Sequence, residues 1–188
     1  AYRATENGTL NVTQSLKTTP GAEMPEMMRF GMVMNLPYAM DQAEWYGRGP
    51  VENYSDRKLS QKVGIYKATA DQLFYPYVRP QETGTMSDLR WWNIKDNNGF
   101  GLRIESDALF SASALHYDLY TLDEGKEKKQ RHSQSLPKSQ YTNLFVDLVQ
   151  AGVGGVDSWS DWGRARKGHR VEYKDYTFSF RISPKTLY

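Results

Sequence analysis

Apolar and polar residues alternate with a period of two wherever the pattern along this chain is clear. In residues 29–36 the alternate positions Phe30, Met32, Met34 and Leu36 are all apolar. Successive side chains of a strand point to opposite faces of a sheet, so this pattern predicts a strand with one buried face. The same alternation recurs at Leu10 and Val12, at Phe100, Leu102 and Ile104, and at Tyr176, Phe178, Phe180 and Ile182. Half-buried antiparallel strands are therefore the expected elements.

Two tight turns can be read between these alternating runs. Residues 96–99, Asp-Asn-Asn-Gly, separate the runs 89–95 and 100–105. Asn and Gly tolerate the positive φ that hairpin turns need, so the three segments together predict a β-hairpin. Residues 6–8, Glu-Asn-Gly, mark a similar turn that leads into a strand over residues 9–16.

The rest of the pattern predicts a single all-β domain. Residues 118–139 lose the alternation and are rich in charge, so we expect a short helix or a surface excursion there. No apolar stripe with helical spacing exceeds two turns, and neither a fixed repeat nor a Gly/Ser- or Pro-rich linker divides the chain. We therefore expect an antiparallel β-sandwich in which residues 1–188 form one domain that buries its own core.

Composition narrows the classes of partner. The chain has 24 Lys and Arg against 22 Asp and Glu, and these charges are scattered, so nothing resembles the basic stripe that binds nucleic acid. No apolar run approaches the roughly 18 to 20 residues that span a bilayer, so we expect a soluble chain with no membrane partner. The absence of Cys excludes disulfides and thiolate metal sites, and it leaves the compartment, cytoplasmic or periplasmic, undecided.

Three irregular segments interrupt the strands and hold residue types that loops recruit for function. We call them the first loop (residues 47–57), the second loop (residues 77–84) and the third loop (residues 152–163). The first two contain the charged residues Glu52, Asp56, Arg57, Arg79 and Glu82. Charge-assisted hydrogen bonds among such side chains hold loops in place, so we expect structural bracing here in preference to catalysis.

The third loop offers a candidate substrate-binding site at Asp157, Ser158 and Trp159. Its glycines let the backbone turn tightly, and Asp157 and Ser158 can satisfy the freed amides. Trp159 then lies on a loop instead of in a strand. The less polar face of a galactose ring presents C–H groups, and stacking on an indole removes apolar surface of both partners from water. The residues alone leave two readings of Trp159 open, a sugar platform and a buried core tryptophan.

The three loops together resemble the terminal domain, or small chain, of family 2 β-galactosidases. The resemblance is carried by Trp45-Tyr46-Gly47-Arg48-Gly49-Pro50, by Glu52-Asn53-Tyr54 with Asp56-Arg57, by Pro76-Tyr77 to Gly84, and by Gly154-Gly155 with Asp157-Ser158-Trp159. It covers essentially the whole chain and implies a galactose-mutarotase-like supersandwich. The chain departs from the family at Val156, where an acid is common, and it is expected to lack the strands that usually open the domain.

The resemblance also implies that this chain contributes to substrate binding and that a neighbouring barrel domain carries the catalytic residues. Trp159 is expected to reach the barrel's active site and to contact the galactosyl group of a terminal β-D-galactoside. The two catalytic glutamates of the retaining scheme belong to that barrel, so we expect no catalytic residue here. The partners implied are the other domains of a parent enzyme. If the opening strands are absent, exposed strand edges are expected to pair in a homo-oligomer.

The family commonly uses Mg²⁺ and Na⁺ near the barrel site. Hard cations need several oxygen ligands that converge on one point, and no acidic loop of that kind occurs in this sequence. No metal is therefore expected to be held by this chain alone.

Two other functions remain open from the sequence. A free-standing mutarotase-like enzyme needs a His and a carboxylate that face each other across the anomeric centre, and His116 is the most suitable base. His132 and His169 lie in charged segments and are read as surface residues. A carbohydrate-binding module would instead present an aromatic surface without chemistry, from Trp91, Trp92, Trp159 and Trp162. Adjacent residues of a strand point to opposite faces, so one of the pair 91–92 is expected in the core.

Overall fold

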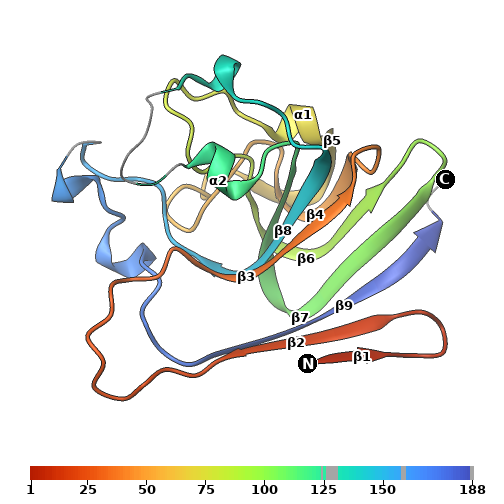
Figure 1. The fold of residues 1–188 in the computed structure, drawn as a ribbon, viewed down its shortest axis with the longest axis horizontal. Helices are drawn as coiled ribbons and strands as arrows, with labels where there is room; N and C mark the ends of the chain where they lie inside the picture. Colours follow the sequence, from red (N-terminus) through yellow and green to blue (C-terminus); the bar gives the residue numbers. More distant parts are fainter. Residues whose placement is uncertain (124, 126–130, 158–159, 187–188) are drawn as a thin grey trace.

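A long strand, β7 (Phe100–Leu115), organises the sheet that forms most of the molecule (Figure 1). One edge of β7 pairs with β6 (Met86–Lys95). The other edge pairs first with β9 (Tyr176–Thr186) and then with β8 (Tyr141–Gln150), so the sheet divides into two arms along this edge. The computed structural model describes residues 1–123, 125, 131–157 and 160–186.

The remaining strands extend the two arms and the β6 side of the sheet. From β9 the sheet continues through β2 (Leu10–Leu16) to β1 (Tyr2–Ala4), and from β8 it continues to β3 (Arg29–Pro37). Beyond β6 lie β4 (Gln42–Gly49) and β5 (Lys62–Thr69). All of these pairings are antiparallel, as the alternating sequence predicted.

The core is one hydrophobic cluster to which both arms and the β4–β6 side of the sheet contribute. Phe30 on β3 stacks on Tyr176 of β9, with ring centroids 5.5 Å apart, so the arms face each other across these half-buried rings. Trp45 and Trp92 are fully buried and stack at 5.3 Å in the same hydrophobic cluster. The prediction of an all-β, antiparallel sandwich is confirmed, because apolar faces of two sheet regions cover each other.

Both predicted hairpin turns are confirmed. Gly99 and Gly8 have positive φ values of 82° and 80°, which glycine adopts without steric cost. The buried face of the alternating strands is also found where it was expected, at Val12, Phe178, Phe180 and Ile182. Phe100 is an exception, since 56% of it is exposed. It begins β7 directly after the turn, and the core does not extend under this end of the hairpin.

Helices are few and short. Thr69 and Gln72 form a capping box at the start of α1 (Ala70–Leu73), and Asp118 caps α2 (Leu119–Leu122). Three single 3₁₀ turns cover Ser133–Ser135, Asp161–Gly163 and Lys167–His169. None of the helices in the described part of the chain is long and apolar enough to cross a membrane.

The charged excursion predicted over residues 118–139 begins with α2 and includes a 3₁₀ turn, so the short helix is confirmed. It is less solvated than its composition indicated. Leu122 and Leu136 are buried in the core cluster and hold both ends of the excursion against the body of the molecule. Residues 124 and 126–130 lie outside the described residues.

The first loop begins later than the sequence indicated. Gly47, Arg48 and Gly49 are the last residues of β4 and pair with β5, so the irregular segment starts at Pro50, after a cis peptide bond. A glycine is required at position 47 because an added Cβ would come within 2.4 Å of Leu89 Cδ2. The prediction took these glycines as turn residues, whereas one of them serves close packing of two strands.

Candidate functional site

Hydrogen bonds join the first loop to each of the other two loops. The hydroxyl of Tyr54 in the first loop donates to Glu82 in the second loop at 3.3 Å. Asp56 in the first loop accepts a bond of 2.8 Å from the backbone N–H of Gly154 in the third loop. The sequence predicted bracing by charged side chains, and the structure shows that much of this bracing runs between loops.

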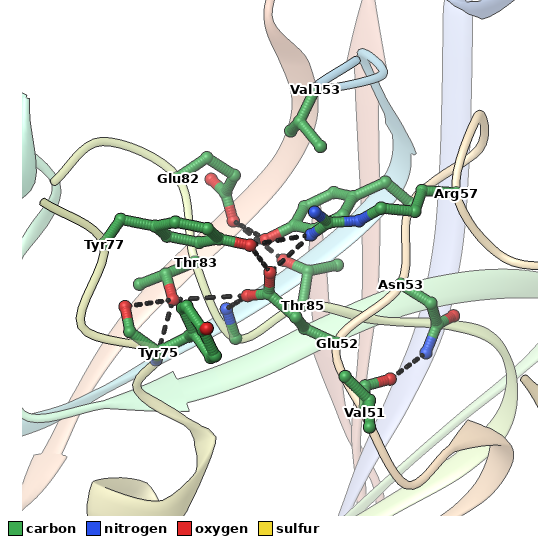
Figure 2. Close-up of polar contacts among 12 residues, drawn as sticks. Val51, Glu52, Asn53, Arg57, Tyr75, Tyr77, Glu82, Thr83, Thr85 and Val153 are labelled. Carbon is green, nitrogen blue, oxygen red and sulfur yellow. Dashed lines mark hydrogen bonds and ion pairs between the residues drawn. The ribbon is translucent and has the colours of Figure 1, made fainter. Parts of the chain in front are cut away.

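Glu52 is the acceptor at the centre of the contact between the first and second loops (Figure 2). Its buried carboxylate accepts hydrogen bonds from the Arg57 guanidinium, the Tyr77 hydroxyl, Thr83 Oγ1 at 3.2 Å and the Gly84 N–H at 2.6 Å. Burial and the bond to Glu52 raise the pKa of Tyr77, which keeps its hydroxyl protonated as a donor. A carboxylate engaged in this way braces the loops and does not serve as an acid or base for a ligand.

Asn53 fixes the first loop to the start of β6. Its N–H donates to the Thr85 carbonyl at 2.7 Å, and its side-chain oxygen accepts from the Ser87 N–H at 3.0 Å. Its side-chain amide donates to the Val51 carbonyl at 2.9 Å. Because Asn53 is fully buried and its polar atoms are paired, it acts as a structural anchor of the loop.

An ion-pair cluster joins the second loop to β3 and β8. Arg29 on β3 lies 3.1 Å from the Asp147 carboxylate on β8 and 3.4 Å from that of Glu82. Burial raises the pKa of Asp147 to about 7, against the opposing effect of Arg29. The pairing of Arg29 with Asp147 was not predicted from the sequence. Its signal was a single acid within the apolar run 144–149, since a charge in such a run needs a buried partner.

The third loop is held at its start by Asp56. The two carboxylate oxygens accept from the N–H groups of Val153 at 3.2 Å and Gly154 at 2.8 Å. Gly152 donates its own N–H to the His169 carbonyl at 2.8 Å. Two successive amides that point at one carboxylate form a backbone nest, which is a favourable site for an anion. Sequence spacing could not reveal this contact, because Asp56 and Gly154 lie 98 residues apart.

Asp157 is the only one of the three predicted site residues within the described part of the chain. It is half-buried and accepts from Ser160, from the N–H at 2.9 Å and from the hydroxyl at 2.7 Å. Its carboxylate therefore ties together the two sides of the loop around residues 158 and 159. Ser158 and Trp159 lie outside the described residues, so their roles remain predictions.

His116, the candidate base of a mutarotase-like enzyme, is enclosed in the protein. His116 is 1% exposed, stacks on Tyr38 with ring centroids 3.8 Å apart, and has Nδ1 3.4 Å from the Thr142 hydroxyl. A base enclosed in this way has no access to a sugar. His132 is exposed, with Nδ1 3.1 Å from the Val78 carbonyl, and His169 is half-buried.

The tryptophans in the described residues do not share one surface. Trp92 is fully buried, which confirms that one member of the pair 91–92 belongs to the core. Trp91 is half-buried and lies under the Arg103 guanidinium, whose carbon is 4.4 Å from the ring centroid. Trp162 is 72% exposed. An aromatic surface formed by all four candidates is therefore not possible.

A shallow cavity of about 170 Å³ lies beside the first loop and is lined in part by Lys58 and Asp88. Asp88 has a positive φ of 53°, and its carboxylate accepts from Arg48 at 2.5 Å and from Lys58 at 2.7 Å. Burial opposes ionisation of Asp88, but these two hydrogen bonds outweigh it and lower its pKa. The Asp88 carboxylate at this cavity is therefore already engaged by two cations.

The described residues do not offer a donor set for a divalent cation. In this part of the chain, no three His, Cys, Asp or Glu side chains converge as a metal site requires.

Comparison with known proteins agrees with the motif resemblance. Residues 1–182 match the family described as beta galactosidase small chain. The chain is 34% identical over 184 residues to a beta-galactosidase of Priestia megaterium and 34% identical over 161 residues to beta-galactosidase BgaC of Bifidobacterium adolescentis. These matches cover 97% and 84% of the chain but only 17% and 15% of the two relatives.

A beta-galactosidase of Vibrio cholerae is 35% identical over 139 residues, which is 74% of the chain and 12% of that protein. The chain thus spans less than a fifth of the length of the curated relatives it matches. The family match covers nearly the whole chain, and the described loops carry the same motifs that suggested the resemblance. This chain belongs to the beta galactosidase small chain family.

Proposed function

We propose that this chain is the small-chain domain of a retaining β-galactosidase that hydrolyses terminal β-D-galactosides. In this proposal Trp159 stacks on the galactosyl group in an active site formed with a separate barrel domain, and Asp157 and Ser158 shape the loop around it. The domain also supplies packing contacts to its neighbours and is inactive alone.

The observation that supports this proposal most strongly is the fixed course of the third loop up to Asp157. Asp56 binds the amides of Val153 and Gly154, and Asp157 binds Ser160 beyond the predicted platform. A sugar platform gains affinity when the loop that carries it is ordered before the ligand arrives, because less conformational entropy is then lost on binding. The membership of the small chain family and the names of the relatives support galactosides as the substrate class.

The acidic residues of this chain are assigned no catalytic role. Glu52 is engaged by the second loop, and Glu82 accepts from Tyr54 and lies beside Arg29. A retaining glycosidase needs two carboxyl groups about 5 Å apart on either side of the scissile bond, one as nucleophile and one as acid/base. In this proposal both belong to the barrel, and the present domain contributes binding alone.

The test compares hydrolysis of a chromogenic β-galactoside by the full-length enzyme that carries this chain with hydrolysis by its Trp159→Ala and Trp159→Phe variants. Loss of the stacking partner should weaken binding by about 1 to 3 kcal/mol and raise KM more than it lowers kcat. Phe keeps an aromatic face, so its KM should lie between those of the wild type and the Ala variant.

Unchanged kinetic constants in both variants would contradict the platform role and leave the domain with packing alone. A second measurement separates the domain from a free-standing module. The isolated 188-residue chain should not hydrolyse the chromogenic galactoside, and it should bind galactose no more tightly than in the millimolar range. Hydrolysis by the isolated chain, or micromolar binding, would overturn the assignment.

A further inference from the structure

Asp56 differs from Glu52 in that both hydrogen-bond donors to its carboxylate are backbone amides of the third loop. Its side chain is half-buried, and its two oxygens accept from Val153 at 3.2 Å and from Gly154 at 2.8 Å. An ionised carboxylate that accepts from N–H groups forms bonds about twice as strong as those between neutral partners. This contact is therefore a strong local constraint on the third loop.

The first loop holds Asp56 rigidly for this contact. The N–H of Arg57 donates to the Tyr54 carbonyl at 2.9 Å, so Asp56 lies inside a closed turn. One end of this turn is tied down by Tyr54, which is 2% exposed and donates its hydroxyl to Glu82. The other end is tied down by the ion pair between Arg57 and the buried Glu52. The position of the Asp56 carboxylate is thus supported by contacts that do not involve the third loop.

The sequence of the third loop is adapted to the approach of this carboxylate. A Cβ added at Gly152 would lie 2.2 Å from Asp56 Oδ2, so only glycine leaves room for the side chain there. Further along, a Cβ at Gly155 would lie 2.4 Å from the Gly163 carbonyl oxygen, and the Val156 N–H donates to the Trp162 carbonyl at 2.8 Å. The two halves of the loop are therefore packed against each other, and Asp56 secures the half that leaves β8.

From these contacts we infer that Asp56 is a positioning residue for galactoside binding. It fixes the path of residues 152–154 and thereby the direction in which the loop presents its sugar-binding part. The inference rests on the proposed function, because it assigns Asp56 an effect on affinity that acts through Trp159. Asp56 itself touches no substrate in this arrangement.

The first test is independent of activity. Amide hydrogen exchange of residues 152–157 is compared between the wild-type full-length enzyme and its Asp56→Asn and Asp56→Ala variants. Asn keeps one acceptor oxygen and places an NH₂ group opposite the second amide, whereas Ala removes both acceptors. Exchange at Val153 and Gly154 should rise in both variants, and more strongly in Ala. Unchanged exchange would overturn the inference.

The second test is kinetic and includes a matched control. Asp56→Ala should raise KM for a chromogenic β-galactoside about tenfold with little change in kcat. Without the charge-assisted hydrogen bonds, the fraction of molecules whose third loop has the binding-competent conformation should fall roughly tenfold. Gly152→Ala should have the same effect, because its Cβ displaces the carboxylate. Asp175→Asn should leave KM unchanged, although Asp175 likewise accepts a backbone N–H, from Thr18 at 2.8 Å.

A double-mutant cycle decides whether Asp56 acts through the proposed platform. In a Trp159→Ala background, Asp56→Ala should produce no further rise in KM, because the group that it positions is absent. A full tenfold rise in that background would overturn the positioning role and leave the proposed function intact. If Trp159→Ala alone has no effect on KM, the proposed function fails, and the positioning role fails with it.

Discussion

At the scale of single residues, the buried carboxylates differ in how they are stabilised. Glu52 accepts several donors, including a backbone N–H, while Asp147 has Arg29 as an ionic neighbour at 3.1 Å and is 2% exposed. Hydrogen-bond donors stabilise the ionised form of a carboxyl group, whereas burial destabilises it. Burial prevails at Asp147 and raises its pKa to about 7.

The raised pKa of Asp147 predicts a pH dependence of stability. The folded value of about 7 lies above the unfolded value of about 4, so between these pH values the folded state retains a proton that the unfolded chain has released. The free energy of unfolding from this group therefore falls as pH rises from about 4 to about 7. Asn at position 147 does not titrate, so this pH-dependent contribution is lost in Asp147→Asn. The free energy of unfolding of the wild type minus that of the variant should therefore decline from pH 4 to pH 7 by an amount on the order of a few kcal/mol.

The measurement is urea denaturation of the 188-residue chain at several pH values. Asp175→Asn is the control, since hydrogen bonds with Lys17 and Thr18 lower the pKa of Asp175 to about 2. The stability that Asp175 contributes is lost only as pH falls through the acid range below about 4. The free energy of unfolding of the wild type minus that of Asp175→Asn should therefore stay constant between pH 4 and 7. A difference for Asp147→Asn that is equally flat would show that this carboxyl group does not titrate near neutrality.

At the scale of elements, the loops are fixed by contacts with short helices and strands. Gly84 ends the second loop with a positive φ of 76°, and its N–H donates to Glu52. A Cβ at this position would lie 2.6 Å from the Leu73 carbonyl oxygen at the end of α1. Because the obstacle is backbone, a side chain at position 84 would force the loop and the helix apart.

Gly84→Ala should therefore destabilise the chain by roughly 2 to 5 kcal/mol, from the left-handed backbone together with the clash. Gly21→Ala is the matched control, because Gly21 has a similar φ of 77° and nothing within 4 Å of an added Cβ. Only the backbone cost of about 1 to 2 kcal/mol is expected there. Chemical denaturation of both variants checks this, and equal losses would contradict the close approach of the loop to α1.

At the scale of the whole molecule, the two arms and the β4–β6 side share one hydrophobic cluster. Trp92 on β6 is fully buried in it and stacks on Trp45 of β4. Interiors are packed as densely as organic crystals, so removal of a large ring leaves a cavity that the neighbours cannot fill. The stability of the fold therefore depends on these central aromatic residues.

Trp92→Ala should lower the free energy of unfolding by roughly 3 to 5 kcal/mol. Trp162→Ala is the control for the loss of an indole as such, because Trp162 is 72% exposed, and it should change stability by less than about 0.5 kcal/mol. Thermal or urea denaturation followed by circular dichroism measures both. A large loss for Trp162→Ala would contradict the exposed position of its ring.

The sequence could predict what depends on near neighbours in the chain. Alternation with a period of two gave the strands, because each side chain of a strand points away from the one before it. Asn and Gly gave the hairpin at Gly99, because its backbone conformation is set locally. The motifs of the three loops indicated the family, and the family comparison agrees.

Only the tertiary structure decided which distant groups meet. One edge of β7 pairs with both arms, through strands that lie far apart in the chain. Alternation predicts a strand but does not specify its partner. For the same reason, the sequence could not predict the hydrogen bond from Val153 to Asp56, 97 residues away, or the pairing of Arg29 with Asp147. Such contacts depend on how whole elements pack, so the sequence by itself determined the elements and the family, and the packing decided which carboxylate holds which loop.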